Sequence, residues 1–283
     1  MPVNSTESTM RIDYSDEWYP DFQRRTSLLK QCVSSRGIVR AKTVTFDKVA
    51  VSGRADTRLR DGKIPASRPD TSQVTKDIVE HYKKYQIDDF DLFRNNSEYR
   101  SMMMGDALAV VNREVDMQII EELDSTSNEY SGTPITGSAL GDFLGLIRNL
   151  RELDVPSDGM LWGLITPALE MQMMRINQFL SVDYVTIKPA VEGAQPVGQY
   201  RRWLGVNWLV HQGLTGMGGT AAQCYIFHST AVGHKDDGKP KFMAGETNED
   251  DYHWCWARVR HCAKAVTPEG ILRFYHNDNA ALA

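Results

Sequence analysis

The feature that most constrains the fold of this chain is a long segment with helical periodicity. Between residues 98 and 123, apolar side chains recur every three or four residues, the spacing that places them on one face of a helix. The preceding Asn95, Asn96 and Ser97 are residue types that cap helix N-termini. The pattern predicts a helix of about seven turns, which is long for a globular domain and would form a spine across a flat or elongated body. The predicted core positions are Met104, Leu108, Val111, Val115, Ile119 and Leu123.

The opposite face of this predicted helix is polar and charged. Carboxylates on one face can serve as catalytic acids and bases, but polar side chains on an amphipathic helix are far more often a solvated face or contacts between subunits. We therefore predict no catalytic role for them. They are Asp106, Asn112, Arg113, Asp116 and Glu122.

The segment 36–72 has a charge opposite to that of the whole chain. Nine basic residues stand against four acidic ones, a net charge of +5, whereas the 283-residue chain has a formal charge of −5. Apolar and polar residues alternate around Val44 and Phe46, and Asp61-Gly62 is a turn signal, so the segment predicts a long two-stranded β-arm. Because two strands have too little core to be stable alone, such an arm needs a partner surface. The alternative is a solvated loop.

The remaining segments differ in pattern. Residues 1–35 mix polar and aromatic residues without a sustained period, which predicts an arm that is poorly ordered alone. Residues 74–92 are interpreted as a strand pair or as a strand leading into a helix. From Leu140 to about residue 240, an amphipathic helix is followed by alternating strands and helices, which predicts an α/β layer. Alternation after residue 250 predicts long strands that return to the first body.

Composition argues against several classes of function. A formal charge of −5 and a pI near 5.8 argue against a surface that binds nucleic acid over its whole area. The four cysteines lack the spacing of a zinc site and are predicted to be reduced thiols of a cytosolic compartment. The first residues lack the pattern of a signal peptide, and no apolar run approaches the roughly 20 residues needed to span a bilayer. We therefore expect a soluble protein without membrane association.

Histidines and acidic residues concentrate toward the C-terminus, which raises the hypothesis of a metal site. None of the spacings matches a metal-binding helix or a compact ligand pair. We therefore expect no catalytic, cofactor-binding or metal site, and a metal-dependent α/β enzyme stays the weaker alternative. The residues in question are His228, His234, His253, His261, Glu246, Glu249, Asp250 and Asp251.

Several stretches of the sequence, taken in order, resemble one protein family. They are Gly105-Asp106-Ala107-Leu108-Ala109 with Arg113, Asp116 and Ile119-Ile120; Phe179-Leu180-Ser181-Val182-Asp183-Tyr184-Val185; Gly205-Val206-Asn207-Trp208; Phe227-His228-Ser229-Thr230-Ala231-Val232-Gly233-His234; and Gly270-Ile271-Leu272-Arg273-Phe274-Tyr275-His276-Asn277-Asp278. From about residue 30 to the C-terminus, these stretches and the order of the predicted elements resemble the major capsid proteins of tailed bacteriophages, which have the Hong Kong 97-type fold.

This resemblance implies an α+β fold with four parts. Residues 1–35 would be an N-terminal arm, 36–73 an extended β-hairpin called the E-loop, 74–138 with 241–283 a P domain containing the spine helix, and 139–240 an α/β A domain. The E-loop would reach over a neighbouring subunit, where its basic side chains would meet acidic surface and fix the register. These side chains would be Lys48, Arg54, Arg58, Arg60, Lys63 and Arg68.

The resemblance also implies a function and partners. The chain would assemble with itself through pentamers and hexamers into an icosahedral shell that encloses a double-stranded DNA genome. It would be a virion protein assembled in the bacterial cytoplasm of the host. Its expected partners are a separate scaffolding protein, a portal protein, a decoration protein where one is used, and packaged DNA on the inner face. An encapsulin-type compartment, which loads an enzyme in place of DNA, is the alternative with the same fold.

Overall fold

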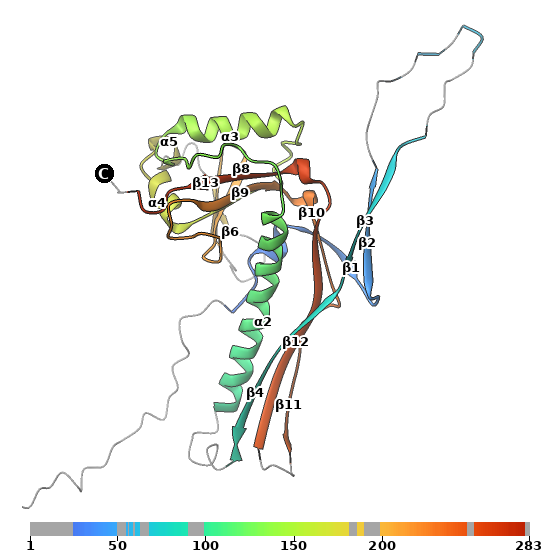
Figure 1. Cartoon of the computed structure of the whole chain (residues 1–283), viewed down its shortest axis with the longest axis vertical. Coiled ribbons are helices and arrows are strands. Elements are labelled where there is room, and N and C mark those ends of the chain that lie inside the picture. Colours follow the sequence, from blue (N-terminus) through green and yellow to red (C-terminus); the bar gives the residue numbers. More distant parts are fainter. Residues whose placement is uncertain are drawn as a thin grey trace, which may run out of the picture.

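The structure is a computed structural model that describes residues 25–49, 55, 57–58, 60–62, 68–89, 99–180, 186–189, 199–247 and 252–280. Figure 1 shows a lower body, built from a long helix and long strands, an upper body with a second sheet, and a two-stranded arm at the side. Both bodies mix helices and strands, so the predicted α+β class is confirmed.

The lower body is a long β-sheet covered on one face by helix α2. Strand β4 (Val79–Asp88) pairs with one edge of β12 (Tyr252–Ala265), and β10 (Val232–Asp236) and β11 (Lys241–Thr247) pair in succession with the other edge. Strand β1 (Ser34–Ile38) adds to β10 in parallel. Helix α2 (Tyr99–Asp124) runs along these strands for 26 residues (Figure 1).

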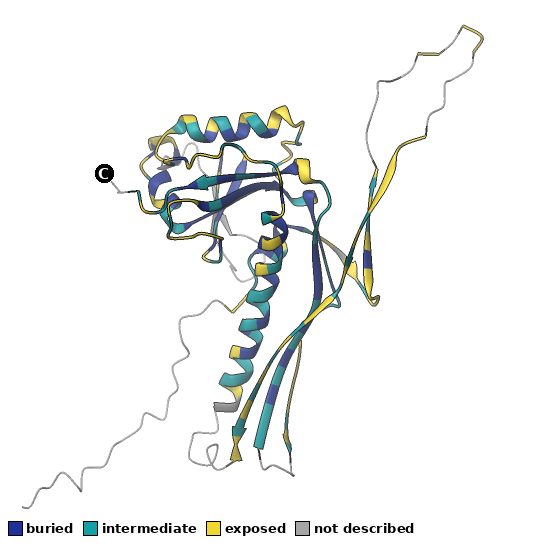
Figure 2. Ribbon diagram, viewed as in Figure 1, coloured by how far each residue is buried: buried dark blue, intermediate teal, exposed yellow. Residues whose placement is uncertain are grey.

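Helix α2 packs through the apolar face that the sequence predicted for residues 98–123. Val111, Val115, Ile119 and Leu123 are buried, but Met104 and Leu108 are only partly buried. The reason is that the upper body closes the core around the C-terminal half of the helix, whereas within the described part of the chain the N-terminal half packs on the sheet (Figure 2). The expected cap at 95–97 lies outside the described residues.

The upper body is a six-stranded sheet in the order β13-β9-β5-β8-β7-β6. Helix α3 (Leu140–Glu152) lies over it, with Phe143 edge-on to Trp203 and Trp208. The Thr166 side chain caps helix α4 (Pro167–Met173), which is followed by α5 (Asn177–Leu180). The strands are β5 (Leu161–Ile165), β6 (Thr186–Pro189), β7 (Gln199–Trp203), β8 (Val206–Val210), β9 (Ala222–His228) and β13 (Ile271–His276).

A two-residue turn separates β7 from β8. Leu204 and Gly205 both have positive φ, 53° and 81°. That is the backbone of a tight hairpin turn whose twist matches the flanking strands. Gly205 reaches this conformation without strain because it has no Cβ.

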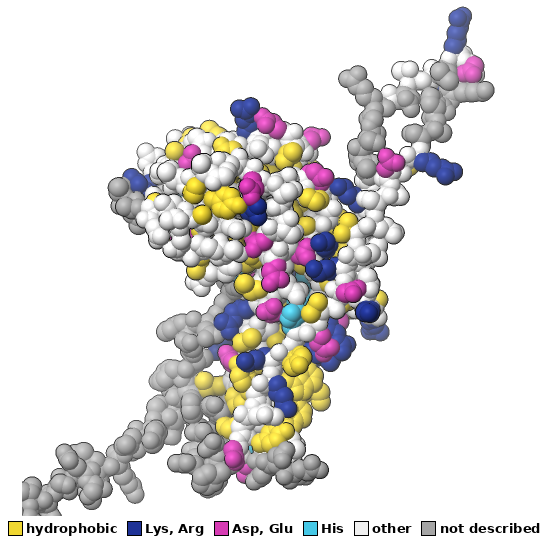
Figure 3. All heavy atoms as spheres, in the orientation of Figure 1, with side chains coloured by type: hydrophobic (Ala, Val, Ile, Leu, Met, Phe, Trp, Pro, Cys, Tyr) yellow, Lys and Arg dark blue, Asp and Glu magenta, His cyan; other side chains and the backbone are white. Residues whose placement is uncertain are grey.

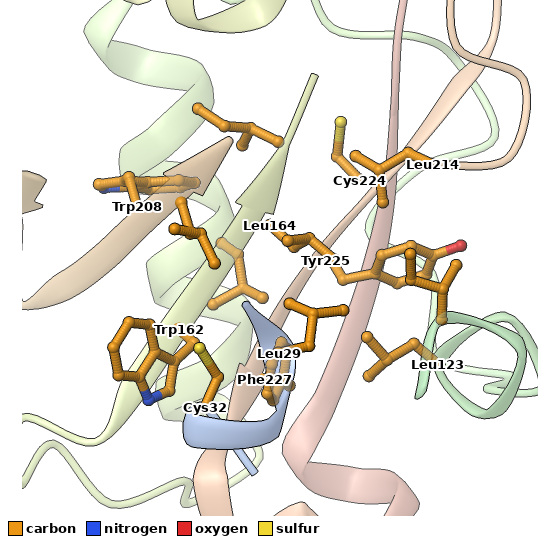
Figure 4. Close-up of a cluster of buried hydrophobic side chains, with 14 of the residues drawn as sticks. Leu29, Cys32, Leu123, Trp162, Leu164, Trp208, Leu214, Cys224, Tyr225 and Phe227 are labelled. Carbon is orange, nitrogen blue, oxygen red and sulfur yellow. The ribbon is translucent and has the colours of Figure 1, made fainter. Parts of the chain in front are cut away.

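The two bodies share one hydrophobic core. Leu29, from the short 3-10 helix η2 (Leu29–Gln31), and Leu123 of α2 lie beside Tyr225 and Phe227 of β9 (Figure 4). Each of these four side chains is at most 1% exposed. The core therefore joins three segments that are far apart in the sequence.

The arm is a two-stranded antiparallel ribbon outside both sheets. Strand β2 (Thr43–Val49) pairs with β3 (Thr71–Asp77), and β4 follows after the single residue Ile78. For residues 74–92 the sequence indicated a strand pair or a strand leading into a helix. β3 and β4 are two consecutive strands that belong to different sheets, and Asp89, directly after β4, has helical backbone. Residues 90–92 lie outside the described residues. The two-stranded arm predicted within 36–72 is present over these described strands, but its second strand continues to residue 77.

Other expected segment boundaries also differ from this arrangement. Strand β10, expected with 139–240, belongs to the lower sheet, and β13, expected with 241–283, is an edge of the upper sheet. Each strand belongs to the sheet of its antiparallel partner, β12 for β10 and β9 for β13, because its backbone hydrogen bonds are satisfied by pairing with that strand. Leu29, Cys32 and Val33 of the expected N-terminal arm lie in the core, since they fill the junction between the bodies. Residues 1–24 lie outside the described residues.

Candidate assembly surfaces

The base of the arm is fixed to the lower body. Phe46 of β2 lies against Gly233 of β10 so closely that an added Cβ there would collide with its ring. Lys48 forms an ion pair with Glu269, with 3.3 Å between Nζ and Oε2. Because this contact is within one chain, Lys48 serves as an anchor of the arm and is less available to a neighbour than the sequence suggested.

The tip of the arm carries exposed basic side chains. Arg58, Arg60 and Arg68 are all exposed, and Lys and Arg side chains are visible at the tip and along the arm (Figure 3). The Arg58 side chain donates to the carbonyl oxygen of Gly62 at 3.1 Å, which helps to close the turn. Arg54 and Lys63 lie outside the described residues.

Asp116 of α2 is an internal anchor and not the solvated or inter-subunit residue that the sequence predicted. It is 0% exposed. Its carboxylate accepts hydrogen bonds from the Ser27 hydroxyl at 2.5 Å and from the Leu28 and Leu29 backbone N–H groups at 3.1 Å each. His211 Nε2 lies 3.5 Å from the same carboxylate. Asp116 therefore ties the segment entering the core to the spine helix.

Glu122, also expected on the solvated face, is a second buried anchor. Its carboxylate accepts from Lys76 Nζ at 2.8 Å and Lys264 Nζ at 3.1 Å, and so joins α2 to the base of the arm and to β12. Burial raises the pKa of Glu122, but the hydrogen bonds from the two lysines outweigh it, and the net pKa is below its usual value. The carboxylate is thus charged at neutral pH and positions β3.

Replacing Glu122 with alanine is expected to lower the free energy of unfolding by about 1–2 kcal/mol, because two charge-assisted hydrogen bonds are lost but both lysines are partly exposed. Urea denaturation of the unassembled chain, followed by tryptophan fluorescence, measures this. Glu122→Gln keeps an acceptor oxygen, so its free energy of unfolding should fall by about half as much. Equal stability of the alanine variant and the unaltered chain would show that Glu122 does not anchor β3.

The histidines that raised the metal hypothesis are divided between separate places. His228 pairs with Asp158 at 2.9 Å and His253 with Asp89 at 2.7 Å. His234 and His261 are neighbours, with ring centroids 5.6 Å apart, and the His81 ring centroid lies 5.2 Å from that of His261, with the two rings tilted. Among the described residues, no group of three or more potential ligands is arranged to hold a metal ion. Glu249, Asp250 and Asp251 lie outside them.

All four cysteines are buried free thiols. Burial raises the pKa of Cys224 to about 12 and also raises the pKa of Cys32 and Cys262. A thiol with a raised pKa is a poor nucleophile, because the thiolate is the reactive form. Within the described part of the chain, no helix is long and apolar enough to cross a membrane.

The sequence contained a signal for the two buried carboxylates. Asp116 precedes Ile120 by four residues and Glu122 follows Ile119 by three, so helical periodicity places both at the edge of the apolar stripe. A carboxylate within such a stripe must find donors when it is buried. The donors are 40 or more residues away in the chain, so their identity required the tertiary structure.

Comparison with known proteins identifies the architecture. A family model described as phage capsid protein matches residues 7–142 and 147–273. No protein with a curated description matches the chain. Among solved structures, a chain of Mycobacterium phage Che8 is 16% identical with a TM-score of 0.68, and the match covers 96% of this chain and 98% of that one. A capsid chain of the cyanophage P-SCSP1u is 14% identical with a TM-score of 0.70, covering 97% and 95%. The capsid of a native GTA particle is 9% identical with a TM-score of 0.71, covering 98% and 100%.

These matches extend over almost the whole of each chain, so the mixed helix-and-sheet fold of Hong Kong 97-type phage capsids is confirmed. The chain belongs to the phage capsid protein family, and it is a major capsid protein of tailed-phage type, a structural subunit of the virion shell. Family and fold neighbours favour a virus shell over the encapsulin-type alternative.

Proposed function

We propose that this chain forms pentamers and hexamers that close into an icosahedral shell around double-stranded DNA, with the segment 36–73 acting as an E-loop over a neighbouring subunit. The observation that carries the proposal is the contrast within the arm. Its base is held by Phe46, Lys48 and Lys76, whereas the basic side chains near its tip are exposed. A two-stranded ribbon is only marginally stable without further packing, so a second subunit is the natural support for this one.

The proposal assigns roles to the two bodies. The lower body would be the peripheral P domain, because it carries the arm that reaches the next subunit. The upper body would be the axial A domain at the centre of each pentamer or hexamer. In these terms β10 goes with the P domain and β13 with the A domain, following the sheets to which they belong.

The same role implies partners beyond the chain itself. A scaffolding protein would direct closure, a portal protein would occupy one vertex, and a decoration protein would bind the outer surface where one is used. Packaged DNA would face the inner surface, and assembly would take place in the host bacterial cytoplasm. We propose these partners because the chain is a capsid subunit.

Reversing the charge of the arm is expected to impair assembly without unfolding the subunit. In a variant with Arg58, Arg60 and Arg68 all changed to Glu, we expect the yield of closed shells to fall at least about tenfold, because the exposed tip would repel acidic surface on its neighbour. The chain would be expressed with the other assembly genes of the phage, and particles counted by electron microscopy and light scattering.

Lysine at the same three positions is the matched control, because it preserves charge and removes only the guanidinium geometry. We expect this variant to keep most of the particle yield. Normal shells from the glutamate variant would contradict the proposed role of the arm. A stable monomer from the unaltered chain, with and without the other assembly genes, would contradict self-assembly itself.

A further inference from the structure

The face of the lower sheet that points away from α2 is rich in aromatic and basic side chains. Alternate residues of a strand point to opposite faces; Cys255, Ala257 and Val259 of β12 are buried, so Trp254, Trp256 and Arg258 point the other way. Tyr82 and Lys84 of β4 stand directly opposite Arg258 and Trp256. We call this surface the aromatic face.

The aromatic face is exposed and shallow. Tyr82 is 71% exposed and Met243 of β11, opposite Trp256, is 55% exposed. A depression of about 380 Å³ lies between the two tryptophans, Tyr82 and their charged neighbours. Hydrophobic side chains gather over this part of the lower body, with Lys and Arg beside them (Figure 3). An apolar patch with a polar rim is typical of a surface that binds another protein segment.

Positive charge predominates on this face. By strand register it holds four basic side chains and two acidic ones. Glu80 pairs with Arg258 at 3.1 Å and Arg260 at 3.3 Å. Lys84 lies 5.9 Å from the ring centroids of both Tyr252 and Trp254. The face therefore suits a ligand with aromatic rings and negative charge. The charged residues are Lys84, Lys241, Arg258, Arg260, Glu80 and Asp88.

One segment of this chain has that composition. Residues 12–22 contain four carboxylates and four aromatic side chains, with no lysine, arginine or histidine. The basic arm has the opposite charge and would be repelled by the aromatic face. The complementary residues of the segment are Asp13, Asp16, Glu17 and Asp21, with Tyr14, Trp18, Tyr19 and Phe22.

We propose that residues 12–22 of one subunit dock on the aromatic face of a neighbouring subunit, a contact that rests on the proposed self-assembly and adds a second link between copies. Docking within one chain is disfavoured by reach. The Arg25 carbonyl accepts from Asn112 Nδ2 at 2.9 Å, which holds this end of the chain beside α2, on the other side of the sheet. The three residues from Arg25 to Phe22 span at most about 11 Å, so the Phe22 end of the segment stays beside α2 and the segment cannot lie along its whole length on the aromatic face of its own chain.

Photocrosslinking in assembled shells tests the contact directly. Tyr82 would be replaced by the photoreactive residue p-benzoylphenylalanine, and shells would be assembled from equal amounts of ¹⁵N-labelled and unlabelled chains. After irradiation, mass spectrometry identifies the attached peptide. We expect residues 12–22 to be the main adduct, with about half of the adducts joining a labelled chain to an unlabelled one. The same photoreactive residue at Leu144, exposed on α3, is the positional control and should not capture this segment.

Charge reversal on adjacent residues supplies a matched pair. Lys84→Glu should reduce the adduct at least about fivefold, because Lys84 is on the aromatic face. Lys83→Glu makes the same change in net charge on the opposite face of the same strand, and should leave the adduct within twofold. Thermal unfolding would verify that both variants fold.

The outcomes separate this contact from self-assembly. Shells that give no adduct with residues 12–22, adducts only within one chain, or adducts with the arm or another protein would each overturn the docking while leaving the shell intact. Equal adduct from Lys84→Glu and Lys83→Glu would overturn the role of charge. Failure of the unaltered chain to form shells would instead overturn the proposed function, and the docking with it.

Discussion

Replacing Asp116 with alanine is expected to lower the free energy of unfolding by about 3–5 kcal/mol, the cost of breaking a buried charged network from one side. The substitution leaves the Leu28 and Leu29 N–H groups without their acceptor inside the core. Urea denaturation of the unassembled chain, followed by fluorescence, gives the difference directly. We also expect residues near Leu29 to lose protection from hydrogen exchange first.

Two variants of the same helix calibrate this effect. Asp116→Asn keeps one acceptor oxygen and the shape of the side chain, so its cost should be smaller, about 1–3 kcal/mol. Glu121→Ala removes an exposed carboxylate five residues away and should change stability by no more than about 0.5 kcal/mol. If Asp116→Ala were as mild as Glu121→Ala, the anchoring role of Asp116 would be rejected.

Mild acidification is expected to destabilise the subunit through two buried histidines. Burial lowers the pKa of His234 to about 4, and burial together with neighbouring His234 and His81 lowers the pKa of His261 to about 3. At a pH between these lowered values and the ordinary histidine pKa of 6.5, the two histidines bind protons in the unfolded chain but not in the folded chain. Stability therefore rises with pH across this range, and we expect a loss on the order of 3 kcal/mol from pH 7 to pH 5.

The surroundings of the pair explain why it stays neutral. Within the described residues, neither ring nitrogen of His234 or His261 has a hydrogen-bond partner. Asp236 on the same strand favours protonation, but it forms an ion pair with Lys30, whose charge opposes protonation. A carboxylate whose pKa is lowered in the folded chain, such as Glu122, stabilises the fold at neutral pH. This stabilisation is lost only when the pH falls below the ordinary glutamate pKa of 4.5. The window from pH 7 to pH 5 therefore reports on the histidines.

A double variant isolates this contribution. With His234 and His261 both changed to leucine, the dependence of unfolding free energy on pH between 7 and 5 should flatten. A full slope in the double variant would show that other groups cause the acid sensitivity.

These anchors explain how a thin molecule keeps a defined shape. Over the described residues, the lower body consists of one sheet and the long helix α2, and the N-terminal half of α2 contributes little to the hydrophobic core. Asp116 attaches the segment around Leu28 to helix α2, and Glu122 attaches the base of the arm and strand β12 to the same helix. A subunit that must present an arm and two bodies to its neighbours needs such fixed junctions, because a contact between subunits is only as specific as the geometry of the surfaces.

Local patterns predicted the elements whose cause is local. The spacing of Val111, Val115, Ile119 and Leu123 predicted α2 to within one residue at each end, since helical hydrogen bonds and an apolar face depend on neighbours in sequence. The alternation around Phe46 predicted the strands of the arm for the same reason. The order of these elements carried the resemblance to phage capsid proteins.

The sequence by itself therefore determined the spine helix, the charged arm and the family. Only the tertiary structure decided that Asp116 and Glu122 are buried, that β10 belongs to the lower sheet, and that β13 closes the upper one. The physical reason is that burial and strand pairing depend on partners that are distant in the sequence, such as Leu29 with Asp116 and Ile271 with Phe227. Local periodicity does not identify such partners. The same holds for the aromatic face, which exists only once β4, β12 and β11 pair in register.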